Sequence, residues 1–396
     1  MSRGRMDRVN TGLVFTRDPQ AGRIIQQALE KTAGLRANFV SGNIDDALRN
    51  PSKLLEAGFI IVDISGAAEP VDAFAAVIDT LPPSTPVVVV GEANDIRLYR
   101  ALSNAGAAEY FFRPLVGDLI TGTLNRLLFD NEVKGNARQG KLIHFVGVRG
   151  GSGVTSIAIR TARLLSSDPP RPVFLMDLNL RSSDMAMQVN LQPNGAIYEA
   201  LDNAERIDDL FLERTLTKVT DNLDLMSTLD PINKPIRLGE APLLTLFGKL
   251  ADRYRYLITE VPTSSVSGLN QMLRLGSMIV LVSDGRMASA RDLARWRALL
   301  SSMLQGVTLV HVLNRSDQPD ALPLEQFARM AGGMPDITIP YSREVAEASV
   351  LGGAASQGFQ TLDAALEPLI EMISGGTARP QASRGRSLLD RVLKRR

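Results

Sequence analysis

A glycine-rich segment near the middle of the chain has the composition of a phosphate-binding loop. Residues 145–156 read FVGVRGGSGVTS, an apolar run that passes through a glycine-rich turn into a predicted helix beginning near Thr155. Glycines let backbone amides point at an anion, and the N-terminus of the helix adds a favourable dipole. The complete P-loop pattern has a lysine directly before the Ser/Thr, where this chain has Val154. The candidate nucleotide-binding residues of the loop are Arg149, Gly150, Gly151, Ser152, Gly153, Val154, Thr155 and Ser156.

Apolar runs of strand length lie on both sides of this loop and are separated by helix-like segments. From Lys141 onward they read KLIHFVGV, PVFLMDL, RYLITEV, MIVLVS and VTLVHVLN. From Gly12 to about Asp130 an earlier set reads LVF, FIIVDI, PVVVV and EYFFRPL. Strands that alternate with helices predict parallel sheets covered by helices on both faces. The sequence therefore predicts an α/β fold.

Length and polar segments predict how the chain is divided. At roughly 100 to 200 residues per domain, 396 residues predict two or three domains. The segment NEVKGNARQG contains two glycines and has no apolar periodicity, which is typical of a linker. We expect a first domain over residues 10–130, a linker over 131–140, a second domain over 141–375 and a basic tail over 376–396.

The composition is that of a soluble globular protein, and it excludes several kinds of site. Hydrophobic residues make up 44% and charged residues 22%, and no apolar run approaches the roughly 18 residues of a membrane span. The chain has no cysteine and two histidines, which excludes a disulfide framework and a cysteine- or histidine-rich metal cluster. The first residues contain no apolar core of a signal peptide, so we expect a cytoplasmic protein.

The C-terminal tail differs in charge from the rest of the chain. Residues 379–396 include seven basic residues and one acidic residue, so the tail carries +6 and the remainder −5. Nucleic acid is therefore not an expected partner of the main body. The last ten residues, SLLDRVLKRR, predict a short basic amphipathic helix. Binding to an anionic membrane surface, docking on a protein partner and a disordered basic end are the alternatives for this tail.

The loop and three later segments resemble the ParA/MinD superfamily of P-loop ATPases. In that family the loop reads Lys-Gly-Gly-x-Gly-Lys-Thr, and Arg149 to Thr155 is similar to it. The later segments correspond to the family's switch I, its Walker B position followed by the switch II proline, and its adenine-contacting asparagine; here they are Asp177-Leu178-Asn179, Glu260-Val261-Pro262 and Asn314. The resemblance implies ATP with Mg²⁺ as cofactor. It also implies that Asp177 and Asn314 bind the nucleotide and that Thr155 and Glu260 hold the metal.

Four chemically active positions of that family are changed in this chain. Arg149 stands for the signature lysine, Val154 for the P-loop lysine, Asn179 for the aspartate that orients water, and Glu260 for the Walker B aspartate. Losing the P-loop lysine should cost about one to two decades of nucleotide affinity. An asparagine can place a water but cannot accept its proton. We therefore expect weak or structural ATP binding with little or no hydrolysis, so that Asn179 and Glu260 are degenerate catalytic positions. A loop that binds no nucleotide is the other possibility.

The N-terminal segment resembles a response-regulator receiver, so we expect a flavodoxin-like (CheY-type) domain there. Asp63, which ends FIIVD, corresponds to the phosphoacceptor. Asp18 is the single acid after the first strand where the family has two, and Arg113 precedes Pro114 where Lys-Pro is usual. Without an acid pair the Mg²⁺ required for phosphorylation is poorly held. We therefore expect a receiver-like domain that is not phosphorylated at Asp63 and serves in dimerisation or docking.

This combination of domains is similar to the CpaE/TadZ family of Flp (Tad) pilus assembly proteins, over roughly residues 10–375. The resemblance implies a cytoplasmic, dimeric localisation scaffold, peripheral at the inner membrane or cell pole, that contacts the pilus secretion ATPase and other Tad components. It also implies a ParA/MinD-type second domain with a mostly parallel sheet. A slow ATPase that cycles between dimer and monomer is the alternative, so an enzymatic function stays open. A DNA-partitioning protein is disfavoured by the −5 charge outside the tail.

Overall fold

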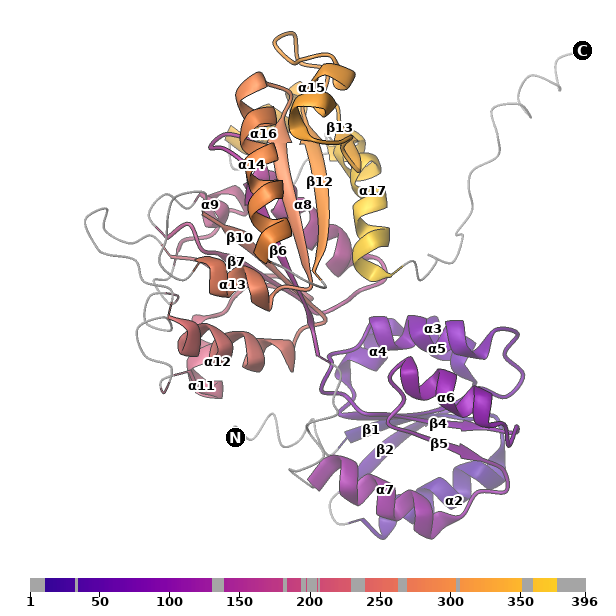
Figure 1. Ribbon diagram of the computed structural model, residues 1–396. Helices are drawn as coiled ribbons and strands as arrows, with labels where there is room; N and C mark the ends of the chain where they lie inside the picture. The colour runs from indigo at the N-terminus through magenta and orange to yellow at the C-terminus, as the bar shows by residue number, and fades with distance from the viewer. Residues whose placement is uncertain are drawn as a thin grey trace, which may run out of the picture.

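The computed structural model contains two α/β sheets, which are formed by separate parts of the chain (Figure 1). It describes residues 11–32, 35–129, 139–180, 184–193, 197, 205, 207–228, 239–262, 269–303, 307–350 and 359–375. Most of the expected linker and the whole expected tail, residues 376–396, lie outside the described residues. Among the described helices none is long and apolar enough to cross a membrane.

The first part of the chain forms a five-stranded parallel sheet in the order β2-β1-β3-β4-β5. This is the flavodoxin-like strand order of doubly wound folds. The elements in chain order are β1 (Thr11–Phe15), α2 (Pro19–Glu30), β2 (Arg36–Val40), α3 (Ile44–Leu48), α4 (Pro51–Glu56), β3 (Phe59–Asp63), α5 (Pro70–Asp79), β4 (Val87–Gly91), α6 (Ile96–Asn104), β5 (Glu109–Phe112) and α7 (Gly117–Phe129).

Helices cover both faces of this sheet and separate its core into two clusters. Helices α2 and α7 pack on one face, and α3, α4, α5 and α6 pack on the other (Figure 1). The central strands β3 and β4 are buried along their whole length, so their sequences are continuous apolar runs. Helix α2 begins at an N-cap, Asp18, which accepts a hydrogen bond from the backbone N–H of Gln20 and is followed by Pro19.

The second part forms an eight-stranded sheet in the order β13-β12-β11-β6-β10-β7-β9-β8. All neighbouring strands are parallel except β8 and β9, which pair antiparallel at one edge. The strands are β6 (Lys141–Gly147), β7 (Val173–Asp177), β8 (Thr217–Thr220), β9 (Leu223–Met226), β10 (Tyr256–Val261), β11 (Met278–Asp284), β12 (Thr308–Asn314) and β13 (Ile337–Ile339). The prediction of an α/β fold with a mostly parallel sheet is confirmed.

Two helical layers enclose this second sheet (Figure 1). Helices α8, α9 and α17 share one core cluster, and α12, α13, α14 and α15 share the other. The helices are α8 (Val154–Ser167), α9 (Met185–Gln188), α11 (Asp209–Thr215), α12 (Glu240–Ala251), α13 (Leu269–Leu275), α14 (Met287–Met303), α15 (Leu324–Ala331), α16 (Arg343–Val350) and α17 (Gln360–Ser374). The P-loop strand β6 lies between β10 and β11, so the loop projects from the middle of the sheet.

A buried ionic cluster joins the two parts of the chain. Asp79, the last residue of α5, accepts hydrogen bonds from Arg171 Nε, from Arg255 Nε at 3.1 Å and from the Tyr256 hydroxyl. The backbone N–H of Ser84 also donates to the carbonyl of Asp252 at 3.2 Å. Arg171 immediately precedes β7, and Tyr256 begins β10. The cluster therefore lies at the amino ends of the strands of the second sheet.

Candidate nucleotide-binding site

The glycine-rich loop connects β6 to α8 and has the backbone of a phosphate cradle. Gly151 and Gly153 have φ of +79° and +87°, a region that other residues rarely adopt. A Cβ on Gly153 would lie 2.3 Å from Nδ2 of Asn314, so close packing also requires glycine there. Helix α8 begins at Val154 with no side-chain cap, which leaves its first N–H groups directed at the cavity in front of the loop.

Asn314 ties the end of β12 to the loop. Its Nδ2 donates a hydrogen bond to the carbonyl of Ser152 at 2.9 Å. Ser152 is buried, and its hydroxyl has no hydrogen-bond partner among the described residues. The structure therefore brings together the loop and the candidate adenine-contacting residue, which are more than 150 positions apart in the sequence.

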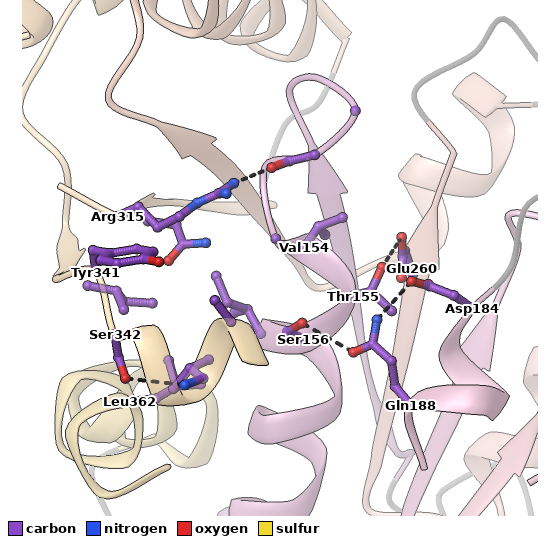
Figure 2. Close-up of a pocket in the computed structure, with 18 of the residues that line it drawn as sticks. Val154, Thr155, Ser156, Asp184, Gln188, Glu260, Arg315, Tyr341, Ser342 and Leu362 are labelled. Carbon is purple, nitrogen blue, oxygen red and sulfur yellow. Dashed lines mark hydrogen bonds between the residues drawn. The ribbon is translucent and has the colours of Figure 1, made fainter. Parts of the chain in front are cut away.

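The carboxylate of Glu260 meets Thr155 at the start of α8, and the charges of Asp177 and Asp184 lie near that carboxylate. The Thr155 hydroxyl donates to Oε1 of Glu260 at 2.9 Å (Figure 2). Burial raises the pKa of Glu260 well above its ordinary value, and the nearby charges of Asp177 and Asp184 raise it further. Asp177 ends β7 and is also fully buried. Sequence reasoning selected Thr155, Asp177 and Glu260. Thr155 and Glu260 line the cavity, whereas Asp177 lies beside Glu260 in the sheet register and does not line it.

The same group of residues fits Mg²⁺. Oε2 of Glu260 is buried and has no hydrogen-bond partner in the described part of the chain, so one carboxylate oxygen is free to bind an ion. Mg²⁺ is usually held by one or two protein oxygens together with water and substrate phosphates, and it neutralises phosphate charge. Thr155 and Glu260 would hold the ion. Among the described residues, no group of three or more histidine, aspartate or glutamate side chains is placed to hold a metal ion.

Val154 and Asn179 have different surroundings in the structure. Val154 is partly buried and packs against the core cluster of α8 and α17, so its side chain is part of the hydrophobic packing. Asn179 lines the cavity, and its backbone N–H donates to Oδ1 of Asp177 at 2.8 Å. Neither residue adds charge to the phosphate cradle. The loop thus keeps the shape of a phosphate cradle, while positions 154 and 179 carry neutral side chains.

The signature position is held by an ion pair within the chain. Nη1 of Arg149 lies 2.7 Å from Oδ2 of Asp292 on α14, and the arginine side chain is 44% exposed. Asp292 also contacts Arg291 and Arg295. Its pKa is lowered by hydrogen bonds and charge from Arg291 and Arg149, although desolvation opposes this shift. Arg149 therefore lines the cavity with its charge already paired.

The cavity in front of the loop has a volume of about 570 Å³, which is within the range of small-molecule sites. One end is formed by the loop, Glu260 and Asn179, and the other by residues that follow β12, by the end of β13 and the segment after it, and by the start of α17. Figure 2 shows Tyr341, Ser342 and Leu362 at this second end, away from Thr155. An apolar wall opposite a phosphate cradle suits a base at one end and phosphates at the other.

Several residues of the cavity were not identified from the sequence. Gln188 on α9 accepts a hydrogen bond from the Ser156 hydroxyl at 3.1 Å and donates to Asp184 at 2.9 Å (Figure 2). Arg315 donates to the carbonyl of Gly151. Gln188 and Asp184 follow a segment without a motif, so no sequence signal marks them. Arg315 directly follows Asn314, and that adjacency is the one signal that the sequence offers.

A second, separate polar group surrounds Asp63 at the carboxyl end of β3. Asp63 accepts hydrogen bonds from Thr16 Oγ1 at 3.0 Å, from the Ser65 backbone N–H at 2.9 Å and from Arg113 Nη2. Arg113 Nε also lies 3.0 Å from Oδ2 of Asp18. The Arg113 guanidinium thus lies between the carboxylates of Asp18 and Asp63 and pairs with both.

Over about 60% of its length the chain has the fold of a ParA family ATPase. The structure of a ParA family ATPase from Chlorobium tepidum aligns with 60% of this chain and 98% of its own, with a TM-score of 0.51 and 19% identity. MinD of Pyrococcus horikoshii in complex with Mg-ADP aligns with 59% of this chain and 98% of its own, with a TM-score of 0.48 and 17% identity. MinD of Pyrococcus furiosus aligns with 58% of this chain and 99% of its own, with a TM-score of 0.48 and 18% identity. No protein-family model and no curated protein matches the sequence.

Proposed function

We propose that this protein is a localisation and assembly scaffold of the CpaE/TadZ type for Flp (Tad) pilus biogenesis. In this proposal its second domain binds ATP with Mg²⁺ weakly or structurally and hydrolyses it little or not at all. The observation that carries the proposal is the cavity in front of the loop, where an intact phosphate cradle lies beside a neutral Val154 and a neutral Asn179. Shape and metal ligands support binding, and the neutral residues argue against turnover.

Phosphoryl transfer depends on positioning and on charge stabilisation around the attacking water. Asn179 offers an amide where the family has a carboxylate, so it supplies no charge to the nucleophile. Val154 is engaged in core packing and supplies no cation to the phosphates. These two positions account for the low hydrolysis that we propose, while Thr155 and Glu260 retain the metal.

The scaffold would act as a homodimer whose partners are the pilus secretion ATPase and other Tad components. The N-terminal domain would be receiver-like without phosphorylation, because Arg113 already neutralises Asp63. The protein would lie in the cytoplasm, peripheral at the inner membrane or cell pole, with the basic tail contributing to membrane contact. Nucleic acid is not among the proposed partners, because the chain outside the tail carries −5.

A slow ATPase of the ParA/MinD type is the second candidate. The hydrogen bond from Thr155 to Glu260 favours it, because it preserves the contact between the loop hydroxyl and the Walker B position. The two candidates differ in a single property, which is whether bound ATP is turned over.

The test is calorimetric titration of the full-length protein with ATP and Mg²⁺, together with a phosphate-release assay on the same sample. We expect binding without measurable release in the wild type, and release in the Val154→Lys/Asn179→Asp double variant. Thr155→Ala is the control, since it removes the metal-binding hydroxyl and should weaken Mg²⁺-dependent binding. If the wild type released phosphate at a rate close to that of the double variant, the protein would be a slow ATPase and the scaffold proposal would be wrong.

A further inference from the structure

Arg315 extends across the mouth of the cavity toward the loop. It directly follows β12 and has φ of +53°, which is unusual for a residue other than glycine. Its Nη2 donates a hydrogen bond to the carbonyl of Gly151, three residues before Val154. Figure 2 shows its guanidinium reaching from the side of Tyr341 to the loop. The backbone turn at Arg315 thus directs a cation into the phosphate cradle from the opposite side of the cavity.

The charge of Arg315 is not neutralised by an ion pair. Within the described ranges no carboxylate lies within ion-pair distance of it, and its buried Nε has no hydrogen-bond partner. Asp320, whose pKa Arg315 helps to lower, is itself paired with Arg286 at 2.8 Å. Arg149, the other arginine that lines the cavity, is bound to Asp292. Arg315 is therefore the cavity arginine with charge available for an anion.

We infer that Arg315 is the phosphate-binding cation of this site and takes the place of the lysine missing at position 154. It would exchange the Gly151 carbonyl for the phosphate oxygens of a nucleoside di- or triphosphate. A guanidinium presents two parallel N–H groups to phosphate and keeps its charge at any physiological pH. The inference rests on the proposed nucleotide function, because it concerns the same cavity.

The experiment measures binding of ATP and of ADP with Mg²⁺ by calorimetry on the full-length protein and its variants. We expect Arg315→Gln to weaken both nucleotides about 10- to 100-fold, because it removes one charged hydrogen-bonding group. Arg315→Lys should retain most of the affinity. Arg295→Gln is the matched control, since that exposed arginine lies on α14 and does not line the cavity.

The compensating variant makes the inference specific. If Arg315 substitutes for the P-loop lysine, Val154→Lys should recover affinity in the Arg315→Gln background and add less in the wild type, so that the two changes are not additive. If Arg315→Gln lowers the stability of the fold, the Val154→Lys/Arg315→Gln variant is still compared with Arg315→Gln, because both proteins lack the arginine.

The outcomes separate this inference from the proposed function. Binding by the wild type that Arg315→Gln leaves unchanged would overturn the inference alone. Tighter binding by Arg315→Gln would also overturn it, because the arginine would then obstruct the cavity. Absence of ATP binding by the wild type and by Val154→Lys would overturn the nucleotide function and the inference with it.

Discussion

Gly153 shows at the scale of one residue why the loop keeps its glycines. Its positive φ forms the turn into α8, and its missing side chain admits the Asn314 amide. Gly150 lies in the same loop but has no φ in the positive range and would have open space around a Cβ. Gly153 is therefore required by its backbone conformation and by close packing, whereas Gly150 is required by neither.

We predict that Gly153→Ala destabilises the protein by about 1–3 kcal/mol and abolishes ATP binding, because the new methyl group is strained and displaces Asn314. Urea unfolding and calorimetric titration with ATP measure the two effects. Gly150→Ala is the control and should change the free energy of unfolding by less than about 0.5 kcal/mol. Equal effects of the two substitutions would contradict the assignment of a special backbone role to Gly153.

Sequence reasoning reached some residues of the site and missed others for identifiable reasons. Glu260 and Asn314 lie near the ends of apolar strands, and Thr155 follows the glycine-rich loop, so local patterns mark all three. Asp184 and Arg315 act through tertiary proximity, which no local pattern encodes. The sequence could not predict the ion pair of Arg149 with Asp292 either, because the two residues are more than 140 positions apart.

At the scale of elements, strands that form clear apolar runs were predictable, the edge strand β5 among them, and four short or weakly apolar strands were not. β3, β4, β6 and β11 are continuous apolar runs because helices cover both faces of their sheets. The sequence analysis did not identify β2, β8, β9 or β13. β2 and β8 lie at sheet edges and have mostly exposed or half-buried residues, β9 pairs with β8, and β13 has three residues. Their apolar patterns are too short or too weak to distinguish them from loops.

The end of β5 and the ends of β1 and β3 are joined by one guanidinium. Arg113 contacts Asp63 at the end of β3, Asp18 after β1 and Glu92 after β4. Asp63 is buried, so its carboxylate depends on this pairing as well as on Thr16 and Ser65. The arginine acts here as an internal cation that holds the loops of the first domain together.

We predict that Arg113→Ala destabilises the first domain by about 3 kcal/mol, because it leaves a buried carboxylate without its cation. Arg126→Ala is the control, since that arginine forms a half-exposed pair with Glu109 and should cost less than about 1 kcal/mol. Urea unfolding followed by circular dichroism measures both variants. If Arg113→Ala were as stable as Arg126→Ala, the ion pair with Asp63 would have no structural role.

At the scale of the whole molecule, Asp79 joins the two domains. Its carboxylate ends α5, where a negative charge is disfavoured by the helix dipole. The two arginines and the tyrosine hydroxyl offset this, and Arg171 is buried together with it. A small polar contact thus links the two parts of the chain.

We predict that Asp79→Asn lowers stability by about 3–5 kcal/mol, because Arg171 then remains buried without a counter-charge. It should also speed proteolytic cleavage between the domains, which limited trypsin digestion and gel analysis would reveal. Asp221→Asn removes a 98% exposed carboxylate from a surface pair with Lys218, and should leave both readouts within error. Unchanged cleavage in Asp79→Asn would show that other contacts fix the domains.

The placement of this contact has a geometric consequence for assembly. Asp79 meets the second sheet at the amino ends of β7 and β10, whereas the nucleotide cavity opens at the carboxyl ends. The cavity face is therefore left uncovered by the first domain. In the homodimer that we propose, two copies joined through that face would hold their first domains away from the interface. Such a particle would act as a bivalent connector, able to raise avidity for partners that are themselves arranged in multiple copies.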